Sequence, residues 1–117
     1  MTHNTRHTLL CRAVRQLLTS WGCVVIPVKN GPTPYTRRDG STGYRRGAIR
    51  VGAADLVACM PSGRFLTVEV KTGRGKPSKP QQRFLADVAQ AGGLAMVVYD
   101  SVAELIDRKD EICFGMV

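Results

Sequence analysis

Residues 55–71 read DLVACMPSGRFLTVEVK, and the expected fold follows from this stretch. It is built from two apolar runs, 54–60 and 65–71, which are rich in valine, leucine and alanine. The sequence Pro-Ser-Gly-Arg between them supplies turn residues. Two such runs joined by a short turn predict an antiparallel β-hairpin.

The register of this hairpin follows from the length of its loop. A three-residue loop pairs Met60 with Arg64 and, counted back along both strands, places Asp55 opposite Glu69. Opposed residues share a face with Cβ atoms about 5 Å apart, and Lys71 points to the same face as Glu69. The prediction depends on the register, because a slip of one residue would turn the strand over.

The remaining periodicity predicts further elements on either side of the hairpin. Helices are expected over Thr5–Ser20, Pro80–Ala91 and Val102–Arg108, strands over Cys23–Val28 and Leu94–Tyr99, and an edge strand over Ile112–Val117. This order predicts an α/β fold with a mixed sheet flanked by helices. A chain of 117 residues fits one compact domain, so we expect residues 1–117 to form a single domain.

Composition and charge narrow the class of partner. Apolar residues make up 44% of the chain, enough for one core, so a disordered chain is excluded. The formal net charge is +8. A domain this basic usually has a polyanion as partner, although charge alone also fits an ordinary soluble basic protein.

Residues 29–50 carry more than half of this net charge. They contain six lysines and arginines against Asp39, together with repeated glycine and proline and almost no apolar periodicity. We interpret the segment as a long basic loop that contacts phosphates, because Tyr35 and Tyr44 interleave with the arginines and can stack on bases. The alternative is a solvated loop without a partner. DNA contacts are expected from Arg37, Arg38, Arg45 and Arg46, and from Lys76 and Lys79 further along the chain.

The cysteines and the apolar runs bear on the cellular compartment. Cys11, Cys23, Cys59 and Cys113 show no zinc-site spacing and are expected to behave as small apolar residues. The sequence shows no secretory signal and no apolar run long enough to span a membrane. We therefore expect a cytoplasmic protein without a membrane partner.

The two facing carboxylates predict a metal site. Carboxylates held this close repel one another unless a cation lies between them. Oxygen ligands from Asp55, Glu69 and a backbone carbonyl suit Mg²⁺, which lowers the pKa of a bound water and neutralises phosphate charge. Lys71 is suited to hold that water and to stabilise the transition state. Each residue alone fits a surface ion pair or a turn, so the chemistry rests on their combination.

Several sequence elements occur in a fixed order around this hairpin. They are Gly52-Ala-Ala-Asp55-Leu56, Val68-Glu69-Val70-Lys71-Thr72, Ser78-Lys-Pro-Gln81-Gln82-Arg-Phe84 and Ala91-Gly-Gly93. Together they resemble the PD-(D/E)XK nuclease superfamily and, within it, the virus-type replication-repair nucleases, or VRR-NUC domains. The resemblance spans roughly residues 50–105 and implies a restriction-endonuclease-like fold. It also implies Mg²⁺-dependent hydrolysis of DNA, with Mn²⁺ as an alternative cation.

The resemblance assigns a role to each matching residue. Asp55 and Glu69 would bind the metal with the Val70 carbonyl, and Lys71 would be the catalytic lysine. Gln81 would orient the water or Lys71. Its neighbour Gln82 would take that place if the register of the helix differed.

The resemblance also implies a substrate and an assembly. Stand-alone members are similar to Holliday-junction resolvases that act as homodimers, which suggests branched DNA, a role in DNA repair, and a phage-encoded protein acting in a bacterial host. Two departures stand out. Ala54 replaces the proline before the metal-binding aspartate. No acidic residue precedes Asp39, so the first helix lacks the supporting glutamate of many relatives, and His7 and Gln16 are the candidates to replace it.

Three other functions fit parts of the pattern. The same site could cut flaps, nicks or simple duplex. The fold and the basic loop could serve a catalytically silent nucleic-acid-binding module, but such a module would be expected to have lost at least one of Asp55, Glu69 and Lys71. An enzyme for small phosphate esters would need a defined pocket, whereas residues 29–50 suit an extended polyanion.

Overall fold

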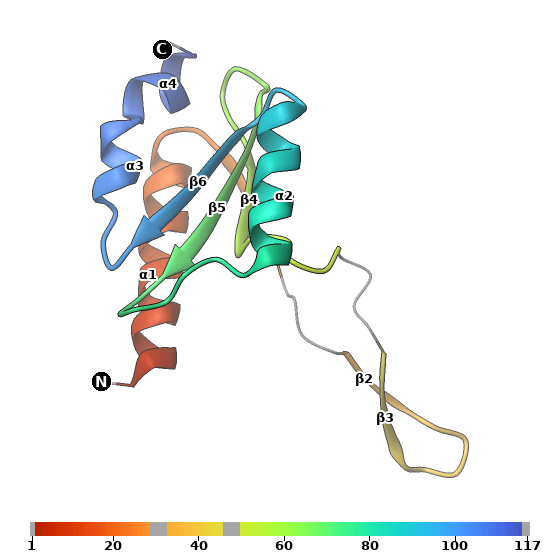
Figure 1. Cartoon of the computed structure of the whole chain (residues 1–117). Helices are drawn as coiled ribbons and strands as arrows, with labels where there is room; N and C mark the ends of the chain where they lie inside the picture. Colours follow the sequence, from red (N-terminus) through yellow and green to blue (C-terminus); the bar gives the residue numbers. More distant parts are fainter. Residues whose placement is uncertain (1, 29–32, 46–49, 116–117) are drawn as a thin grey trace.

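A four-stranded mixed sheet with helices on both faces forms the body of the protein in a computed structural model of the chain (Figure 1). The structure describes residues 2–28, 33–45 and 50–115. The helices are α1 (His3–Ser20), α2 (Lys79–Gln90), α3 (Ala103–Asp107) and α4 (Lys109–Phe114), and the strands are β1 (Val24–Pro27), β2 (Thr33–Thr36), β3 (Thr42–Arg45), β4 (Leu56–Cys59), β5 (Phe65–Lys71) and β6 (Leu94–Tyr99). Within these ranges no helix is long and apolar enough to cross a membrane.

The sheet has the order β1-β4-β5-β6 and confirms the predicted α/β class. Strand β4 pairs antiparallel with both β1 and β5. Strands β5 and β6 run parallel and are joined through α2. The β4–β5 register pairs Leu56 with Val68 and Cys59 with Phe65, as the three-residue loop predicts. The Met60 N–H donates to the Arg64 carbonyl at 2.9 Å and closes that loop.

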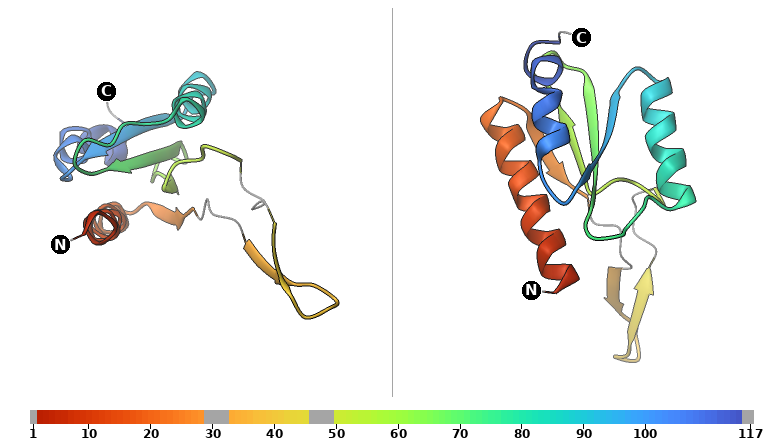
Figure 2. Two further views of the ribbon diagram at one scale, coloured as in Figure 1. Left: turned by 60° about the horizontal axis from the view of Figure 1, so that its bottom comes forward. Right: turned by 60° about the vertical axis from the view of Figure 1, so that its left-hand side comes forward.

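One face of the sheet packs against α1, α3 and α4 to form the core (Figure 2). Alternate residues of β5 and β6 point into it, among them Leu66, Val68 and Val98. From α1 the core receives Leu10, Val14 and Leu18 on one stripe. Leu9 is exposed and Leu17 is only half-buried, because the helix contacts the sheet along one line.

Helix α2 covers only part of the opposite face. It contacts β5 and β6. Its residues Phe84, Leu85 and Val88 are half-buried, whereas Ala89 is exposed. The rest of this face has no helix over it among the described residues (Figure 2). We call this part the open sheet face, which consists of Val24, Ile26, Val57, Cys59 and Phe65.

Strands β2 and β3 pair into a separate two-stranded hairpin that extends away from the body (Figure 1). A long loop was expected over residues 29–50, but residues 33–45 form a β-hairpin, so that expectation was wrong for this part. Threonine and tyrosine flank the turn, and Asp39-Gly40 is a strong hairpin signal that the low apolar content obscured. Asp39 accepts from the Ser41 amide at 2.9 Å and its hydroxyl at 2.6 Å, which lowers the pKa of Asp39. We call residues 33–45 the arm.

The C-terminal segment is helical, so the predicted edge strand Ile112–Val117 is wrong. Helix α4 ends at Gly115, which adopts φ 69°. Of the apolar residues from 112 to 115, the part of this segment that the structure describes, only Ile112 is buried, and it packs in the core beside α3. A short apolar run does not distinguish a strand from a buried helical turn. Met116 and Val117 lie outside the described residues.

Candidate active site

The segment before β4 approaches the start of α2 so closely that only glycine fits at position 52. Gly52 has φ +85°, and a Cβ there would lie 2.5 Å from the carbonyl carbon and oxygen of Pro80. Ala53 and Ala54 follow as small, buried residues. The Ala54 that replaces the superfamily proline therefore lies in the packed interior. This contact fixes the backbone just before Asp55 against α2.

Asp55 lies at the entry to β4 and is held by the neighbouring strand. Its Oδ2 accepts a hydrogen bond from the Val70 N–H at 2.8 Å. Its Oδ1 lies 3.4 Å from Nε2 of His7 on α1. The Val70 carbonyl was predicted as a metal ligand, and that role stays a prediction. What the structure shows of Val70 is the amide contact to Asp55.

Glu69 lies opposite Asp55 when the β4–β5 pairing is continued by one residue beyond Leu56 and Val68. Its side chain is buried on the sheet face that carries α2. The residue is 2% exposed. Burial first, and then the hydrogen bond and charge of Asp55, raise the pKa of Glu69 to about 8, with Lys71 acting in the opposite direction. In the described part of the chain, Glu69 Oε2 is one of two buried polar atoms without a hydrogen-bond partner, the other being Glu104 Oε2 on α3. A buried, unpaired carboxylate oxygen beside a second carboxylate suits a cation.

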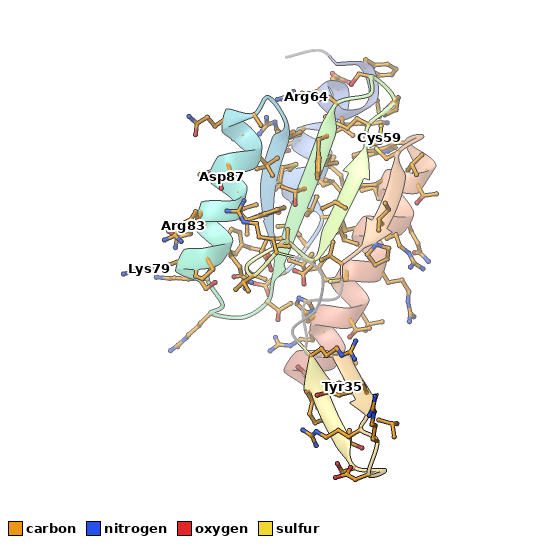
Figure 3. The ribbon with its side chains drawn as sticks, turned by 90° about the vertical axis from the view of Figure 1, so that its right-hand side faces the viewer. Tyr35, Cys59, Arg64, Lys79, Arg83 and Asp87 are labelled. Atoms are coloured by element: carbon orange, nitrogen blue, oxygen red, sulfur yellow. The ribbon has the colours of Figure 1, made fainter. Side chains whose placement is uncertain are left out.

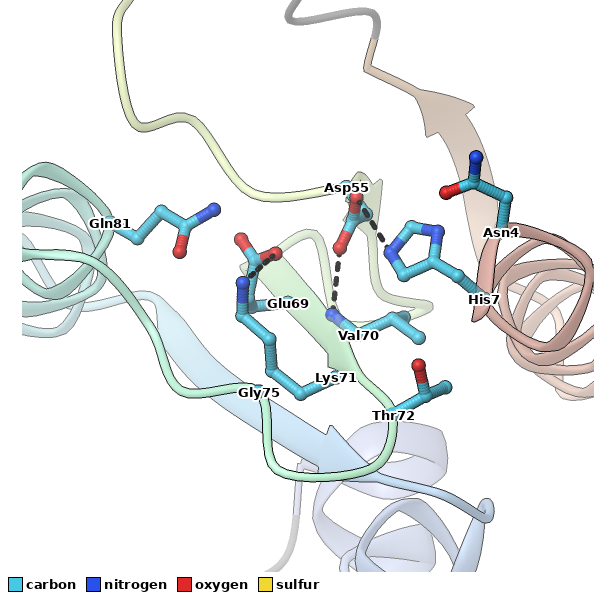
Figure 4. A pocket seen from close by; sticks show the side chains of 9 residues that line it. All are labelled: Asn4, His7, Asp55, Glu69, Val70, Lys71, Thr72, Gly75 and Gln81. Atoms are coloured by element: carbon cyan, nitrogen blue, oxygen red, sulfur yellow. Dashed lines mark hydrogen bonds and ion pairs between the residues drawn. The ribbon is translucent and has the colours of Figure 1, made fainter. Parts of the chain in front are cut away.

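Lys71 completes the group from the end of β5 (Figure 4). Its Nζ lies 3.6 Å from Glu69 Oε1, and its side chain is mostly buried. The loop after it is tied to β6, because the Asp100 carboxylate accepts from the Gly73 N–H and the Asp100 N–H donates to the Lys71 carbonyl. Asp100 therefore holds this loop against the end of β6.

Gln81 faces Glu69 from the first turn of α2 (Figure 4). Its Oε1 accepts from the Ser78 N–H at 2.8 Å, and its own N–H donates to Ser78 Oγ, which together form a capping box. The capping box therefore uses the side-chain amide oxygen of Gln81 as a hydrogen-bond acceptor. Gln82 donates to the Pro77 carbonyl outside the site, so the structure brings Gln81 and not Gln82 to the two carboxylates.

These side chains surround a hollow of about 300 Å³ between the ends of α1 and α2. It is lined by Asn4, His7, Asp55, Glu69, Val70, Lys71, Thr72, Gly75 and Gln81. The structure thus brings together all four predicted catalytic residues. Of the two candidates on the first helix, His7 reaches the hollow, whereas Gln16 is exposed elsewhere.

Comparisons with known proteins identify the family of the chain. A family model described as the VRR-NUC domain matches residues 40–101, which is more than half of the chain. The chain belongs to the VRR-NUC family. A solved structure described as a VRR_NUC domain matches with a TM-score of 0.61 and 20% identity, covering 88% of this chain and 92% of that chain. At this identity, the likeness to the solved structure concerns the fold. The search of curated proteins found no match.

VRR-NUC domains are nucleases of the PD-(D/E)XK type. The donor set of this chain fits the divalent cation that such nucleases usually use, because two carboxylates meet in one hollow and one of them carries an unpaired, buried oxygen. Asp55 and Glu69 are the residues that would hold it. Oxygen donors of this kind suit Mg²⁺ and Mn²⁺.

The predicted DNA-binding residues lie outside the hollow. Arg37, Arg38 and Arg45 are exposed on the arm, and Arg46 lies outside the described residues. Lys76 is exposed in the loop before α2, and Lys79 is exposed at the first residue of α2. The Lys79 side chain projects from the body (Figure 3).

Two basic residues near α2 are engaged within the protein. Arg50 pairs with Asp87 and lies over the Phe84 ring, so this part of the predicted basic loop is anchored to α2. Arg64 donates to the Gly92 carbonyl at 2.7 Å and pairs with Glu111.

One neighbour of the site was missed by the sequence analysis. Cys11 lies one turn after His7, with its Sγ 3.7 Å from His7 Nδ1. Burial, and then the charges of Asp55 and Glu69, raise the pKa of the Cys11 thiol to about 12. The spacing of four residues on a helix was the available signal, because such residues share a face.

Proposed function

We propose that this VRR-NUC domain is a divalent-metal-dependent DNA endonuclease whose active site consists of Asp55, Glu69, Lys71 and Gln81. The observation that carries the proposal is the buried Glu69 carboxylate, which has an unpaired oxygen and faces Asp55 and Lys71 in one hollow. A purely structural carboxylate would be expected to have its buried oxygens paired.

Each residue has a defined part in the proposed hydrolysis. A divalent cation, when bound, supplies positive charge at the phosphate. Asp55 and Glu69 would hold it, and Glu69 must lose its proton to do so. The Lys71 ammonium donates hydrogen bonds to the attacking water or to the phosphate, and the free amide nitrogen of Gln81 orients that water. The water oxygen bonds to phosphorus as the water gives up a proton to solvent. The bond to O3′ breaks and O3′ takes a proton from solvent, which leaves a 5′-phosphate and a 3′-hydroxyl.

The arm is proposed to hold DNA beside the hollow. Arg45 lies 4.5 Å and Arg37 5.9 Å from the Tyr35 ring centroid, so the two guanidinium groups flank one aromatic ring. Arg37 also donates to the Thr42 carbonyl at 2.7 Å. Tyr44 is mostly exposed on the other face of the arm and is therefore the tyrosine free to stack on a base.

The proposal includes branched DNA as substrate and a homodimer as the active form. Val24 and Ile26 on the open sheet face are 68% and 59% exposed, and Phe65 is 43% exposed. Adjacent apolar side chains exposed to this degree are typical of an interface. Two copies related by a twofold axis would present two hollows, which suits paired cuts in a four-way junction.

The test is cleavage of labelled four-way junction, flap and linear duplex, with Mg²⁺ or with EDTA. The wild-type protein is compared with Glu69→Gln, and Glu104→Gln is the matched control because Glu104 has the other unpaired, buried oxygen and does not line the hollow. We expect symmetric, metal-dependent cuts in the junction that are lost in Glu69→Gln and kept in Glu104→Gln.

Other outcomes have defined meanings. Cleavage mainly of flap or duplex would keep the active site and reject the junction preference. Tight DNA binding in EDTA, with no cleavage of any substrate in Mg²⁺ or Mn²⁺, would reject the nuclease and favour the binding module.

A further inference from the structure

Three side chains on the α1 side of the hollow hold different ligand atoms close together. His7 and Cys11 lie on successive turns of α1, and Asp55 meets them from the start of β4. The Nε2 of His7 lies 3.4 Å from Asp55 Oδ1 and 3.9 Å from Cys11 Sγ. One ligand atom from each residue lies within 4.8 Å of both others.

Two of the three separations are close to those around a tetrahedral ion. With metal–ligand bonds of about 2.0–2.3 Å, two ligands of a tetrahedral zinc ion lie about 3.3–3.8 Å apart. The His7–Asp55 separation lies in that range, and the His7–Cys11 separation exceeds it only slightly. All three residues are half-buried, so a fourth position remains for water or a substrate oxygen.

The chemistry of this donor set differs from that of the two carboxylates. Imidazole nitrogen and thiolate sulfur prefer zinc-class transition metals, whereas carboxylate oxygens suit Mg²⁺. A neutral His7 with the Cys11 thiolate and the Asp55 carboxylate carries two negative charges, which a divalent ion neutralises. The thiol proton of Cys11 leaves to solvent as the sulfur–metal bond forms.

Asp55 is oriented to serve this second position. Its Oδ2 is engaged by the Val70 N–H, which leaves Oδ1 directed at His7. Glu69 and Lys71 lie on the other side of Asp55 (Figure 4). An ion on the His7 side would therefore adjoin the carboxylate pair and share only Asp55 with it.

We propose that His7, Cys11 and Asp55 form a binding position for a zinc-class transition metal, separate from the Asp55–Glu69 pair. The ion ties α1 to the entry of β4 and fixes the orientation of Asp55. On this chain the ion would add the Cys11 sulfur to the contact that His7 already makes with Asp55. The proposal goes beyond DNA cleavage, and its measurement does not depend on that activity.

Cobalt is the probe, because Co²⁺ occupies zinc sites and reports its ligands by absorption. The full chain is titrated with Co²⁺ under reducing conditions without Mg²⁺. We expect the visible bands of four-coordinate Co²⁺ and a near-ultraviolet thiolate-to-cobalt band that saturates at one equivalent. Co²⁺ at the Asp55–Glu69 pair would have no sulfur ligand and would not contribute to the thiolate band. Cys11→Ser should remove the thiolate band and weaken Co²⁺ binding at least about tenfold, since losing even an outer partner costs about 10–100-fold. His7→Asn should weaken binding in the same way.

Two controls separate this position from others. Cys59→Ser removes an exposed cysteine on β4 and should leave the thiolate band unchanged. Glu69→Gln should abolish cleavage yet keep the band, which distinguishes failure of this proposal from failure of the nuclease. Absence of the thiolate band in the wild-type protein, or its persistence in a folded Cys11→Ser variant, would overturn the proposal.

Discussion

Gly52 sets the distance between the entry of β4 and the start of α2. Its backbone has φ +85°, and the two nearest atoms that an added Cβ would meet belong to the backbone of Pro80. Backbone atoms cannot rotate away as the end of a side chain can. The close contact between Gly52 and Pro80 therefore fixes how Asp55, three residues after Gly52, lies relative to Gln81, the residue after Pro80.

Gly52→Ala is expected to lower the free energy of unfolding by about 3 kcal/mol or more, because the left-handed conformation and the clash with Pro80 add. Gly63→Ala is the matched control, since Gly63 has φ +87° and nothing within 4 Å of the added Cβ. Gly63→Ala should lower the free energy of unfolding by about 1–2 kcal/mol. Denaturant unfolding measures both. Equal losses would show that the contact with Pro80 does not matter.

The buried Glu69 makes stability depend on pH. Its pKa is raised from 4.5 to about 8, so between these values the folded metal-free protein holds a proton that the unfolded chain has lost. The contribution of Glu69 to the free energy of unfolding therefore falls as pH rises through this window. Thermal melts in EDTA should show Glu69→Gln gaining stability relative to wild type as pH rises. A difference independent of pH would mean that Glu69 is already ionised without metal.

At the scale of elements, the first turn of α2 joins helix capping to the active site. Gln81 uses its Oε1 in the capping box, which leaves its amide nitrogen for the hollow. A carboxylate in its place would keep the capping oxygen but remove the donor and add a third negative charge near Glu69.

Gln81→Glu should therefore keep the stability of wild type to within about 1 kcal/mol while reducing cleavage at saturating DNA. Ser78→Ala is the opposite control, because it removes the cap and keeps the amide. It should lower stability by about 1 kcal/mol with little effect on cleavage. The two variants are compared by unfolding and by single-turnover kinetics. Full activity in Gln81→Glu would exclude a role for the amide in catalysis.

The arm concentrates charge on a hairpin whose geometry is set by its own side chains. Gly43 lies under Tyr35, where an added Cβ would be 2.6 Å from the ring, so the ring packs onto bare backbone. Arg37 and Arg45 both lie near this ring. Such an arrangement holds two cations at one place on the arm.

Arg37→Ala and Arg45→Ala together should weaken DNA binding in EDTA and flatten its salt dependence by about 0.9 slope units per lost phosphate contact. Arg108→Ala is the control, because Arg108 is exposed but paired with Glu111 on α4. Fluorescence anisotropy over a range of salt concentrations measures the slope. An unchanged slope in the double variant would remove the arm from the DNA interface and leave the active site unaffected.

At the scale of the whole molecule, the sheet is covered completely on one face and partly on the other. The open sheet face lies on the β1 side, away from α2, and its exposed valine, isoleucine and phenylalanine have no cover among the described residues. A twofold contact there would bury them without obstructing the hollow at the end of the sheet.

Ile26→Glu should convert a dimer into a monomer in sedimentation equilibrium, because it places a charge within an apolar contact. Ile106→Glu is the matched control, since Ile106 is similarly exposed on α3, outside the open sheet face. It should leave the mass unchanged. A wild-type protein that sediments as a monomer at all concentrations would contradict the dimer.

The sequence alone determined the hairpin register and therefore the meeting of Asp55, Glu69 and Lys71. Strand periodicity and loop length are local, so counting residues was sufficient. The β-hairpin of the arm was also encoded locally, by Asp39-Gly40, but almost no apolar periodicity marked it. The C-terminal helix was not predictable, because only the position of the core decides which residue of a short apolar run is buried.

Other features were decided by the tertiary structure alone. The spacing of His7 and Cys11 shows only that they share a face of α1. Whether that face meets Asp55 depends on how Leu10, Val14 and Leu18 pack against the sheet. The raised pKa of Glu69 likewise requires α2 to exclude water from its side chain. The open sheet face exists because the crossover helix packs on β5 and β6 and leaves β1, β4 and part of Phe65 at the start of β5 uncovered. Contacts between distant segments set burial, and burial decides both the charge state of the site and the surface left for a partner.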